Sequence, residues 1–149
     1  MRVVAISACL VGKECRYDGS NNLDETLLSL LKDDRLIEFC PEDFAFGSPR
    51  PTMDLVELDG DIVAISNESG EDLSLPIKRY AREFLDTHRD IELYIGKDRS
   101  PSCGVCSAKV YDKEKNLIST KGIGLMSKEA KKRDIECIDA TNYTKEKSI

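Results

Sequence analysis

The sequence lacks several features that would assign it to a specialised class of protein. It has a single histidine, His88, so histidine cannot supply a set of metal ligands. No apolar run approaches the roughly 20 residues that a membrane-spanning helix needs. The formal net charge is -6, and an acidic chain is poorly suited to grip nucleic-acid phosphates. We therefore expect neither a membrane nor a nucleic-acid partner.

A secretory signal is also missing. The apolar stretch 3–11 follows Arg2, but no small-residue cleavage site comes after it, and Lys13, Glu14 and Arg16 follow at once. A buried first strand is the better interpretation. We expect a cytoplasmic protein whose six cysteines are reduced. In such a compartment, cysteines more often bind metal or take part in catalysis than form disulfides.

The bulk composition is that of a folded chain. The protein has 149 residues, of which 40% are hydrophobic and 34% charged, and these values are typical of globular proteins. We see no internal repeat, linker or low-complexity segment, so residues 1–149 are expected to form a single domain.

Apolar periodicity predicts alternating strands and helices. The predicted strands are 2–7, 35–39, 91–95 and 135–138, and the predicted helices are 24–32, 75–87 and 123–132. This alternation predicts an α/β protein with a three-layer α/β/α arrangement and a mostly parallel sheet.

Two hairpins interrupt this alternation. Asp59-Gly60 lies between the apolar runs 55–58 and 62–66, and it predicts an inserted β-hairpin or an antiparallel edge of the sheet. Residues 108–111 and 117–119 predict a smaller hairpin. The charged tail from about residue 144 is expected to fray.

Three cysteines follow strands of the predicted sheet. Cys9 comes just after 2–7, Cys40 directly follows 35–39, and Cys103 lies in the loop after 91–95. The carboxyl ends of parallel strands meet at one edge, where α/β proteins bind ligands, so we predict that these thiols converge. Cys137 instead lies inside a predicted strand and is expected to act as a small hydrophobe.

Three converging thiols indicate a metal site that leaves one position open. A structural zinc site takes four ligands, often in close pairs, and Cys103 and Cys106 form the one close pair here. Iron–sulfur clusters are also usually held by four cysteines. An open position is what a catalytic metal site requires.

Polar residues next to these cysteines could move protons. Glu42 lies two residues after Cys40, and Ser100 and Ser102 flank Pro101 beside Cys103. A carboxylate near a metal is a natural proton carrier where histidine is absent. As alternatives, Glu42 could be a surface acid or a helix cap, and the serines could simply form a turn.

Arginines are also predicted at this edge of the sheet. Arg16 and Arg50 lie in loops at the carboxyl edge, and Arg99 precedes Ser100. The guanidinium fork suits phosphate or carboxylate binding, so Arg16 and Arg50, together with Ser102, are candidate substrate contacts. Alternatively, the arginines pair with the many acidic residues.

Five motifs in order resemble a known family. They are Ser-Ala-Cys-Leu-Val-Gly (7–12), Cys-Arg-Tyr-Asp-Gly (15–19), Cys-Pro-Glu (40–42), Gly-Ser-Pro-Arg-Pro (47–51) and Arg-Ser-Pro-Ser-Cys-Gly (99–104). The chain is similar in these motifs to the family catalogued as domain of unknown function 523, whose characterised branch is the thiouracil desulfidases. The resemblance spans Arg2 to about Ala140.

The resemblance implies a cofactor and a reaction. Cys9, Cys40 and Cys103 match the three cysteines that hold a 4Fe–4S cluster in this family, and Glu42 and Ser100 match its catalytic residues. The implied reaction is the non-redox, hydrolytic removal of sulfur from a thiolated pyrimidine (thiouracil or its nucleotide), which releases hydrogen sulfide.

This chain departs from the family pattern at two places. Residues 43–47 are bulkier than the small, glycine-rich stretch expected there, and Thr52-Met53 stand where a proline is common. We expect both places to lie in the pocket wall and to influence which substrate fits.

Two other functions are compatible with the residues. The first is a thiol redox or sulfur-carrier protein that uses Cys103 and Cys106. The second is a non-enzymatic module that binds a nucleotide or a structural zinc ion. A search for bound iron and a Cys106 substitution would separate these from a cluster-dependent enzyme.

Overall fold

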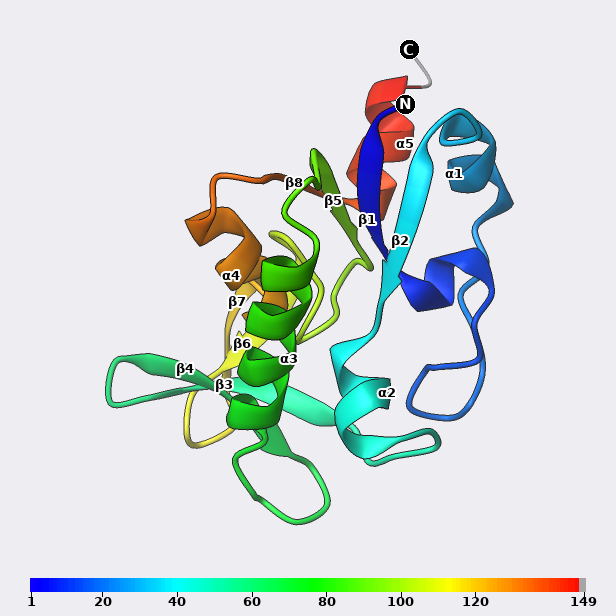
Figure 1. The fold of residues 1–149 in the computed structure, drawn as a ribbon. Coiled ribbons are helices and arrows are strands. Elements are labelled where there is room, and N and C mark those ends of the chain that lie inside the picture. Colours follow the sequence, from blue (N-terminus) through cyan, green and yellow to red (C-terminus); the bar gives the residue numbers. More distant parts are fainter. Residues whose placement is uncertain (148–149) are drawn as a thin grey trace.

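The computed structural model describes residues 1–147 (Figure 1). The strands are β1 (Val3–Ser7), β2 (Arg35–Phe39), β3 (Met53–Leu58), β4 (Asp61–Ser66), β5 (Leu93–Gly96), β6 (Ala108–Tyr111), β7 (Leu117–Gly122) and β8 (Glu136–Asp139). The helices are η1 (Ala8–Val11, a short 3-10 helix), α1 (Glu25–Leu30), α2 (Pro41–Phe46), α3 (Ser74–Thr87), α4 (Leu125–Lys132) and α5 (Ala140–Lys147).

The first sheet has the order β2-β1-β5-β8, and all of its strands run parallel. Successive β1 side chains alternate between its faces, as strand geometry requires. Val4 and Ile6 pack in a core cluster with residues of α1 and α5, whereas Val3 and Ala5 pack with residues of α3 and α4. Helices thus cover both faces (Figure 1), and the predicted α/β class with three layers is confirmed.

The two predicted hairpins form a second sheet together. Its order is β4-β3-β6-β7; the pairs β3–β4 and β6–β7 are antiparallel, and β3 and β6 run parallel. Asp59 and Gly60 both have positive φ at the β3–β4 turn, as a two-residue hairpin loop requires. The hairpins pair with each other because their apolar faces, with Leu55 and Val110, share a core with Ile77 of α3.

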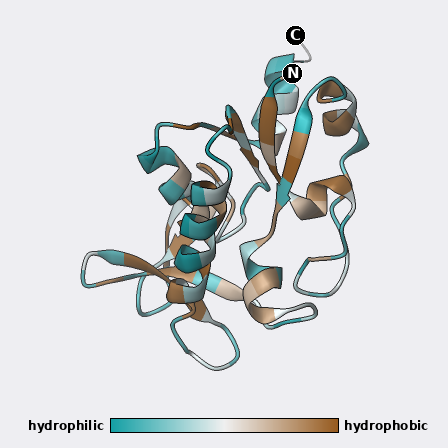
Figure 2. Ribbon diagram, viewed as in Figure 1, coloured by the Kyte–Doolittle hydropathy of each residue, from teal (hydrophilic) through white to brown (hydrophobic). Residues whose placement is uncertain are grey.

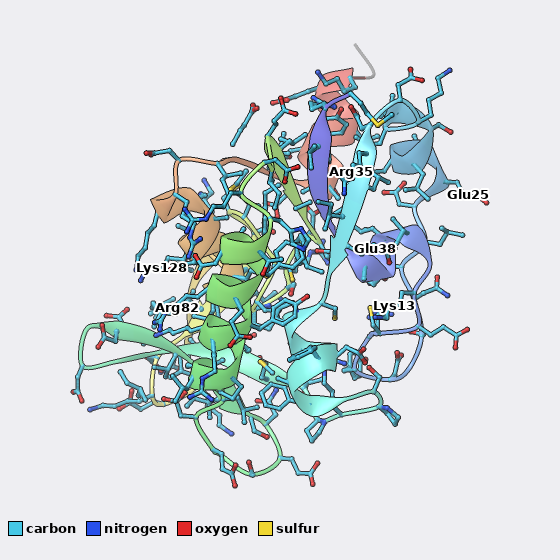
Figure 3. All side chains as sticks on the ribbon, viewed as in Figure 1. Lys13, Glu25, Arg35, Glu38, Arg82 and Lys128 are labelled. Carbon is cyan, nitrogen blue, oxygen red and sulfur yellow. The ribbon has the colours of Figure 1, made fainter. Side chains whose placement is uncertain are left out.

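Hydropathy and charge follow this layering. Figure 2 shows hydrophobic strands in the first sheet and a hydrophilic outer face on α3. The charged residues labelled in Figure 3 include Arg82 on α3 and Lys128 on α4, both exposed. Among residues 1–147, no helix is both long and apolar enough to cross a membrane.

Two helices differ from the sequence prediction. Helix α2 occupies residues expected to form a turn and loop after Cys40; it has Pro41 in its first turn with two acids, a composition that suits a helix N-terminus. Helix α5 extends to Lys147, so the tail is helical from Ala140 to that residue. Residues 148–149, the rest of the segment expected to fray, lie outside the described residues.

Candidate active site

A cavity of about 360 Å³ lies at the carboxyl edge of the first sheet, against the start of β3 in the second. This volume is that of a small-molecule site. The structure brings all eight sequence-predicted site residues to its lining. The lining comprises Ser7, Ala8, Cys9, Cys15, Arg16, Tyr17, Phe39, Cys40, Glu42, Arg50, Thr52, Met53, Lys97, Asp98, Arg99, Ser100, Pro101, Ser102 and Cys103.

Backbone geometry explains how three distant cysteines reach one cavity. Cys9 lies in η1 directly after β1, Cys40 caps α2 directly after β2, and Cys103 lies in the loop after β5. The loop folds back tightly on its own strand: a Cβ at Gly96, the last residue of β5, would lie 1.8 Å from the Cys103 carbonyl oxygen. Only glycine permits this close approach.

A fourth thiol, Cys15, also lines the cavity. Its side chain is 1% exposed and hydrogen-bonds the side chains of Cys9 and Cys40. The hydrogen bond from Cys15 lowers the pKa of Cys9 from 9.0 to about 6 and also lowers the pKa of Cys40. These bonds raise the pKa of Cys15 itself. Sequence reasoning gave Cys15 no role; its place in the motif at 15–19 was the available signal.

Cys103 has different surroundings from the other thiols. It is 6% exposed, and burial raises its pKa above the usual value. Arg16 and Lys97 lie on the lining and lower the pKa of Cys9 through their positive charge. A metal group would replace the protons of the thiols that it binds.

The donor set fits an iron–sulfur group better than a single ion. Within residues 1–147, no three His, Cys, Asp or Glu side chains lie close enough together to hold one metal ion. Thiols bound to different irons of a cluster stand farther apart than ligands around one ion. Soft thiolates are also the ligands that iron–sulfur clusters take. Cys9, Cys40 and Cys103 line one cavity from separate segments and offer three such thiols.

Glu42 lies in the first turn of α2 with its carboxylate 13% exposed. Arg50, only 6% exposed, places Nε 3.6 Å from Glu42 Oε1, an ion pair too long for a hydrogen bond. Arg50 Nη1 donates to the carbonyl oxygens of Cys15 and Gly47, each at 3.0 Å, and to Ser48 Oγ at 2.7 Å. Arg50 thus ties the loop 47–51 to the cavity, while its Nε has no hydrogen-bond partner among the described residues.

The two predicted serines contact Glu42 and each other. Ser102 Oγ donates to Glu42 Oε2 at 2.6 Å and lies 3.2 Å from Ser100 Oγ. Ser100 Oγ accepts from the backbone N–H groups of Ser102 at 3.3 Å and Cys103 at 3.0 Å. The serines therefore belong to one hydrogen-bonded group with the carboxylate.

A buried carboxylate that sequence reasoning missed fixes the loop carrying these serines. Asp139, 1% exposed at the end of β8, accepts from the backbone N–H groups of Val105 at 2.8 Å and Cys106 at 3.0 Å. It also accepts from Ser107 Oγ at 3.0 Å, and Ser107 Oγ accepts from Arg99 N at 2.8 Å. The only available signal was an acid directly after an apolar strand.

Other sequence-predicted features lie away from the cavity lining. Cys106 is exposed and its Sγ donates to Asp139 at 3.4 Å. Cys137 packs against the core cluster shared by α3 and α4, and His88 caps the end of α3. Thr52 and Met53 line the cavity as expected, but none of residues 43–47 does, because most of them form α2.

Helix α2 is also held in place by residues of two neighbouring segments. Lys13, labelled in Figure 3, forms an ion pair with Asp43 of α2 at 3.9 Å. Tyr80 of α3 accepts from the backbone N–H of Cys40 at 3.2 Å, and its ring contacts that of Phe44 at a tilt of 47°. Helix α2 is therefore anchored at both the η1 side and the α3 side.

Comparison with known proteins agrees with the motifs. A family model for 2-thiouracil desulfurases matches residues 4–142. The chain is 32% identical over 110 residues to the uncharacterized protein YbbK of Bacillus subtilis (strain 168). The alignment covers 68% of this chain and 73% of YbbK.

A solved structure is also similar over nearly the whole chain. It is that of the 4Fe–4S-dependent thiouracil desulfidase TudS, with a TM-score of 0.74 and 27% identity, covering 93% of this chain and 91% of TudS. The resemblance seen in the sequence motifs is thereby confirmed. The chain belongs to the 2-thiouracil desulfurase family.

Proposed function

We propose that this protein is a 4Fe–4S-dependent desulfidase that hydrolyses the C=S bond of a thiolated pyrimidine and releases hydrogen sulfide. One observation carries the proposal: three thiols, a carboxylate and two hydroxyls from three separate segments line one small cavity. Membership of the desulfurase family and the similarity to TudS support it.

Cys9, Cys40 and Cys103 are the residues that would hold the cofactor. When bound by three thiolates, such a cluster supplies an open iron that acts as a sulfur-seeking Lewis acid toward the thiocarbonyl. Cys15 stays a thiol beside two of the ligands, where its hydrogen bonds to their sulfur atoms orient them.

The polar residues carry the proton transfers of hydrolysis. Glu42 is the general base that finally accepts the proton lost by the attacking water, and Ser100 contacts the reacting atoms. The buried Arg50, with Nε 3.6 Å from Glu42 Oε1, holds the Glu42 carboxylate in place at the cavity wall. The ring carbon exchanges sulfur for oxygen and the sulfur leaves as sulfide, so no electron is transferred and the reaction is non-redox.

The cations around the cavity favour a substrate with an anionic group. Arg16, Lys97 and Arg99 line it together with the arginine that pairs with Glu42. Because Arg50 is already engaged by Glu42 and two backbone carbonyls, these three cations are the ones left to bind a phosphate. A thiolated nucleotide therefore suits the cavity better than the free base.

The alternative of a redox pair made by Cys103 and Cys106 fits the structure less well. Cys103 is buried at the cavity, whereas Cys106 is exposed outside it and bonded to Asp139. A structural zinc ion also lacks a compact ligand set within residues 1–147.

Sulfide release tests the proposal directly. The protein is reconstituted anaerobically with iron and sulfide and incubated with 4-thiouracil or with its nucleotide, and sulfide and the oxo product are measured. We expect wild type to release both in equal amounts and Glu42→Ala to lose at least about a hundredfold in rate. Wild-type protein that binds iron but releases no sulfide from either compound would overturn the proposal.

A matched variant controls for the removal of an acid. Glu57 lies in β3 of the second sheet, outside the cavity lining, and its side chain is exposed. Glu57→Ala is expected to keep wild-type rates, so a loss confined to the Glu42 variant reports on the site.

A further inference from the structure

The hydrogen bonds of Ser102 have a defined direction. Its side chain is 1% exposed, and its single hydroxyl proton is committed to Glu42 Oε2 at 2.6 Å, because a carboxylate can only accept. Ser102 Oγ therefore faces Ser100 Oγ, 3.2 Å away, as an acceptor. Because this proton is already donated to Glu42, Ser102 cannot also donate to a substrate. It therefore does not serve as the hydrogen-bonding substrate contact that the sequence predicted.

The hydrogen bonds of Ser100 also have a defined direction. Two backbone N–H groups, those of Ser102 and Cys103, already donate to its Oγ at 3.3 and 3.0 Å. A serine oxygen has two lone pairs, so the remaining function of Ser100 is to donate its proton, and Ser102 Oγ is the acceptor within reach. The order of donation is Ser100 to Ser102 to Glu42.

We propose that Ser102 is a positioning residue that relays a proton from Ser100 to Glu42, so that Ser100 Oγ becomes the basic oxygen at the cavity. The arrangement has the logic of a catalytic triad, in which a base acts on a hydroxyl through an intervening group. The N–H groups of Ser102 and Cys103 stabilise the negative charge that develops on Ser100 Oγ.

The proton balance is simple. The Ser100 O–H bond breaks as its proton bonds to Ser102 Oγ, and the proton that Ser102 held bonds to Glu42 Oε2. Ser100 Oγ takes a proton from the attacking water, whose oxygen bonds to the ring carbon as the π pair of the C=S bond moves onto sulfur. When the C–S bond breaks, sulfur leaves with the bonding electron pair, and the added hydroxyl loses its proton as the C=O bond forms. That proton and the one returned along the relay both bond to sulfur, which leaves as hydrogen sulfide. No electron enters or leaves.

The relay alters the division of labour between the two catalytic residues. Glu42 is the final proton acceptor, while Ser100 is the group next to the water. That the relay acts in the hydrolysis of a thiolated pyrimidine rests on the proposed function. That Ser100 is basic does not depend on the proposed function. A chemical probe of Ser100 therefore separates the two.

The first experiment is labelling of the reconstituted full chain with diisopropyl fluorophosphate under anaerobic conditions, followed by peptide mass spectrometry. We expect Ser100 to be phosphorylated faster than the other serines, with loss of fluoride. Ser102→Ala and Glu42→Gln should each slow this labelling about a hundredfold. Ser102→Thr, which keeps a hydroxyl, should restore much of it.

Two controls keep the result interpretable. Ser29→Ala alters an exposed serine of α1 and should leave Ser100 labelling unchanged. Iron content and circular dichroism identify a variant that fails to fold or to load its cofactor; if Ser102→Ala fails in this way, Glu42→Gln alone decides the outcome. Equal labelling of Ser100 in wild type and in the folded variants, or no labelling of wild type, overturns the relay.

Turnover gives the second readout. With thionucleotide as substrate, Ser102→Ala should lower kcat with KM unchanged, because Ser102 contacts Glu42 and Ser100 and not the substrate. A second measurement follows the rate in mixtures of light and heavy water. A plot of rate against deuterium fraction should be curved for wild type, since several protons move together. For Ser102→Ala the same plot should be a straight line. A straight line in both proteins counts against the relay. Reactive Ser100 without sulfide release refutes the desulfidase proposal and leaves the relay standing.

Discussion

The cavity has two chemically different sides. The thiol side comprises Cys9, Cys15, Cys40 and Cys103, and the polar side comprises Glu42, Arg50, Ser100 and Ser102. Cys9 and Cys40 directly follow parallel strands, so the sheet sets their separation, whereas Cys15 and Cys103 lie in the loops after η1 and β5. Residues of the polar side lie on α2 and two loops, and hydrogen bonds hold them in place.

This difference teaches that the two sides should fail in different ways. Loss of Cys9, Cys40 or Cys103 should remove the cofactor and leave the fold. Loss of a polar residue should leave the cofactor but disturb either the chemistry or the local packing. Pairs of variants, one at the site and one outside it, can test this separation.

The largest effect is expected for Cys40→Ala. With one of three thiolates gone, the reconstituted variant should retain little iron and little visible absorbance and should release no sulfide. Cys106→Ala removes an exposed thiol outside the cavity and should match wild type in both measurements. Full iron loading of the Cys40 variant would break the assignment of the thiol side.

A loss of stability is expected for Arg50→Gln. The substitution leaves the mostly buried Glu42 carboxylate without its cation, and it should lower the free energy of unfolding of the cluster-free protein by about 3 kcal/mol. In contrast, Arg35→Gln breaks an exposed ion pair with Asp90 and should cost under about 1 kcal/mol. Urea unfolding curves measure both, and equal midpoints for the two variants would contradict the prediction.

A smaller effect, on reactivity, is expected for Cys15→Ala. The Cys15 hydrogen bond lowers the pKa of Cys9 to about 6, so Cys9 is mostly thiolate at neutral pH in the cluster-free protein. Without that donor the pKa rises, and alkylation of Cys9 by iodoacetamide at pH 7 should slow about tenfold. The pH at half-maximal rate should move upward; an unchanged midpoint would show that Cys15 does not tune this thiol.

The smallest effect is expected for Arg16→Gln. If Arg16 binds the phosphate of a thionucleotide, KM for the nucleotide should rise about fivefold while KM for 4-thiouracil stays constant. Steady-state sulfide release with each compound measures this. A parallel rise for both compounds would instead assign Arg16 to the pyrimidine or to the cavity shape.

The sequence was most informative about the thiol side. Cys9, Cys40 and Cys103 could be predicted to converge because each follows a strand with a clear apolar pattern, and parallel strands bring their carboxyl ends together. The parallel sheet and its covering helices were predictable for the same reason. The periodicity of 75–87 also gave α3 to within one residue.

The polar side and the second sheet were harder to predict from the sequence. Periodicity gives no information about which hairpins pair, so the union of β3–β4 with β6–β7 could not be predicted. Helix α2 is only a few residues long, and its proline also suits a turn. The contacts of Ser102 with Glu42 and of Asp139 with the loop at 105–107 join residues far apart in the chain. Such pairs have no local signal.

The position of Asp139 has a consequence for the order in which the protein is made. The loop that carries Ser100 and Cys103 is fixed by this carboxylate, which lies at the end of the last strand. While the ribosome is still adding β8, Cys9, Cys40 and Cys103 have all been synthesised, yet the loop has no anchor. Iron delivered at that time would meet an incomplete site. The site is therefore complete only after β8 has been synthesised and has paired with β5.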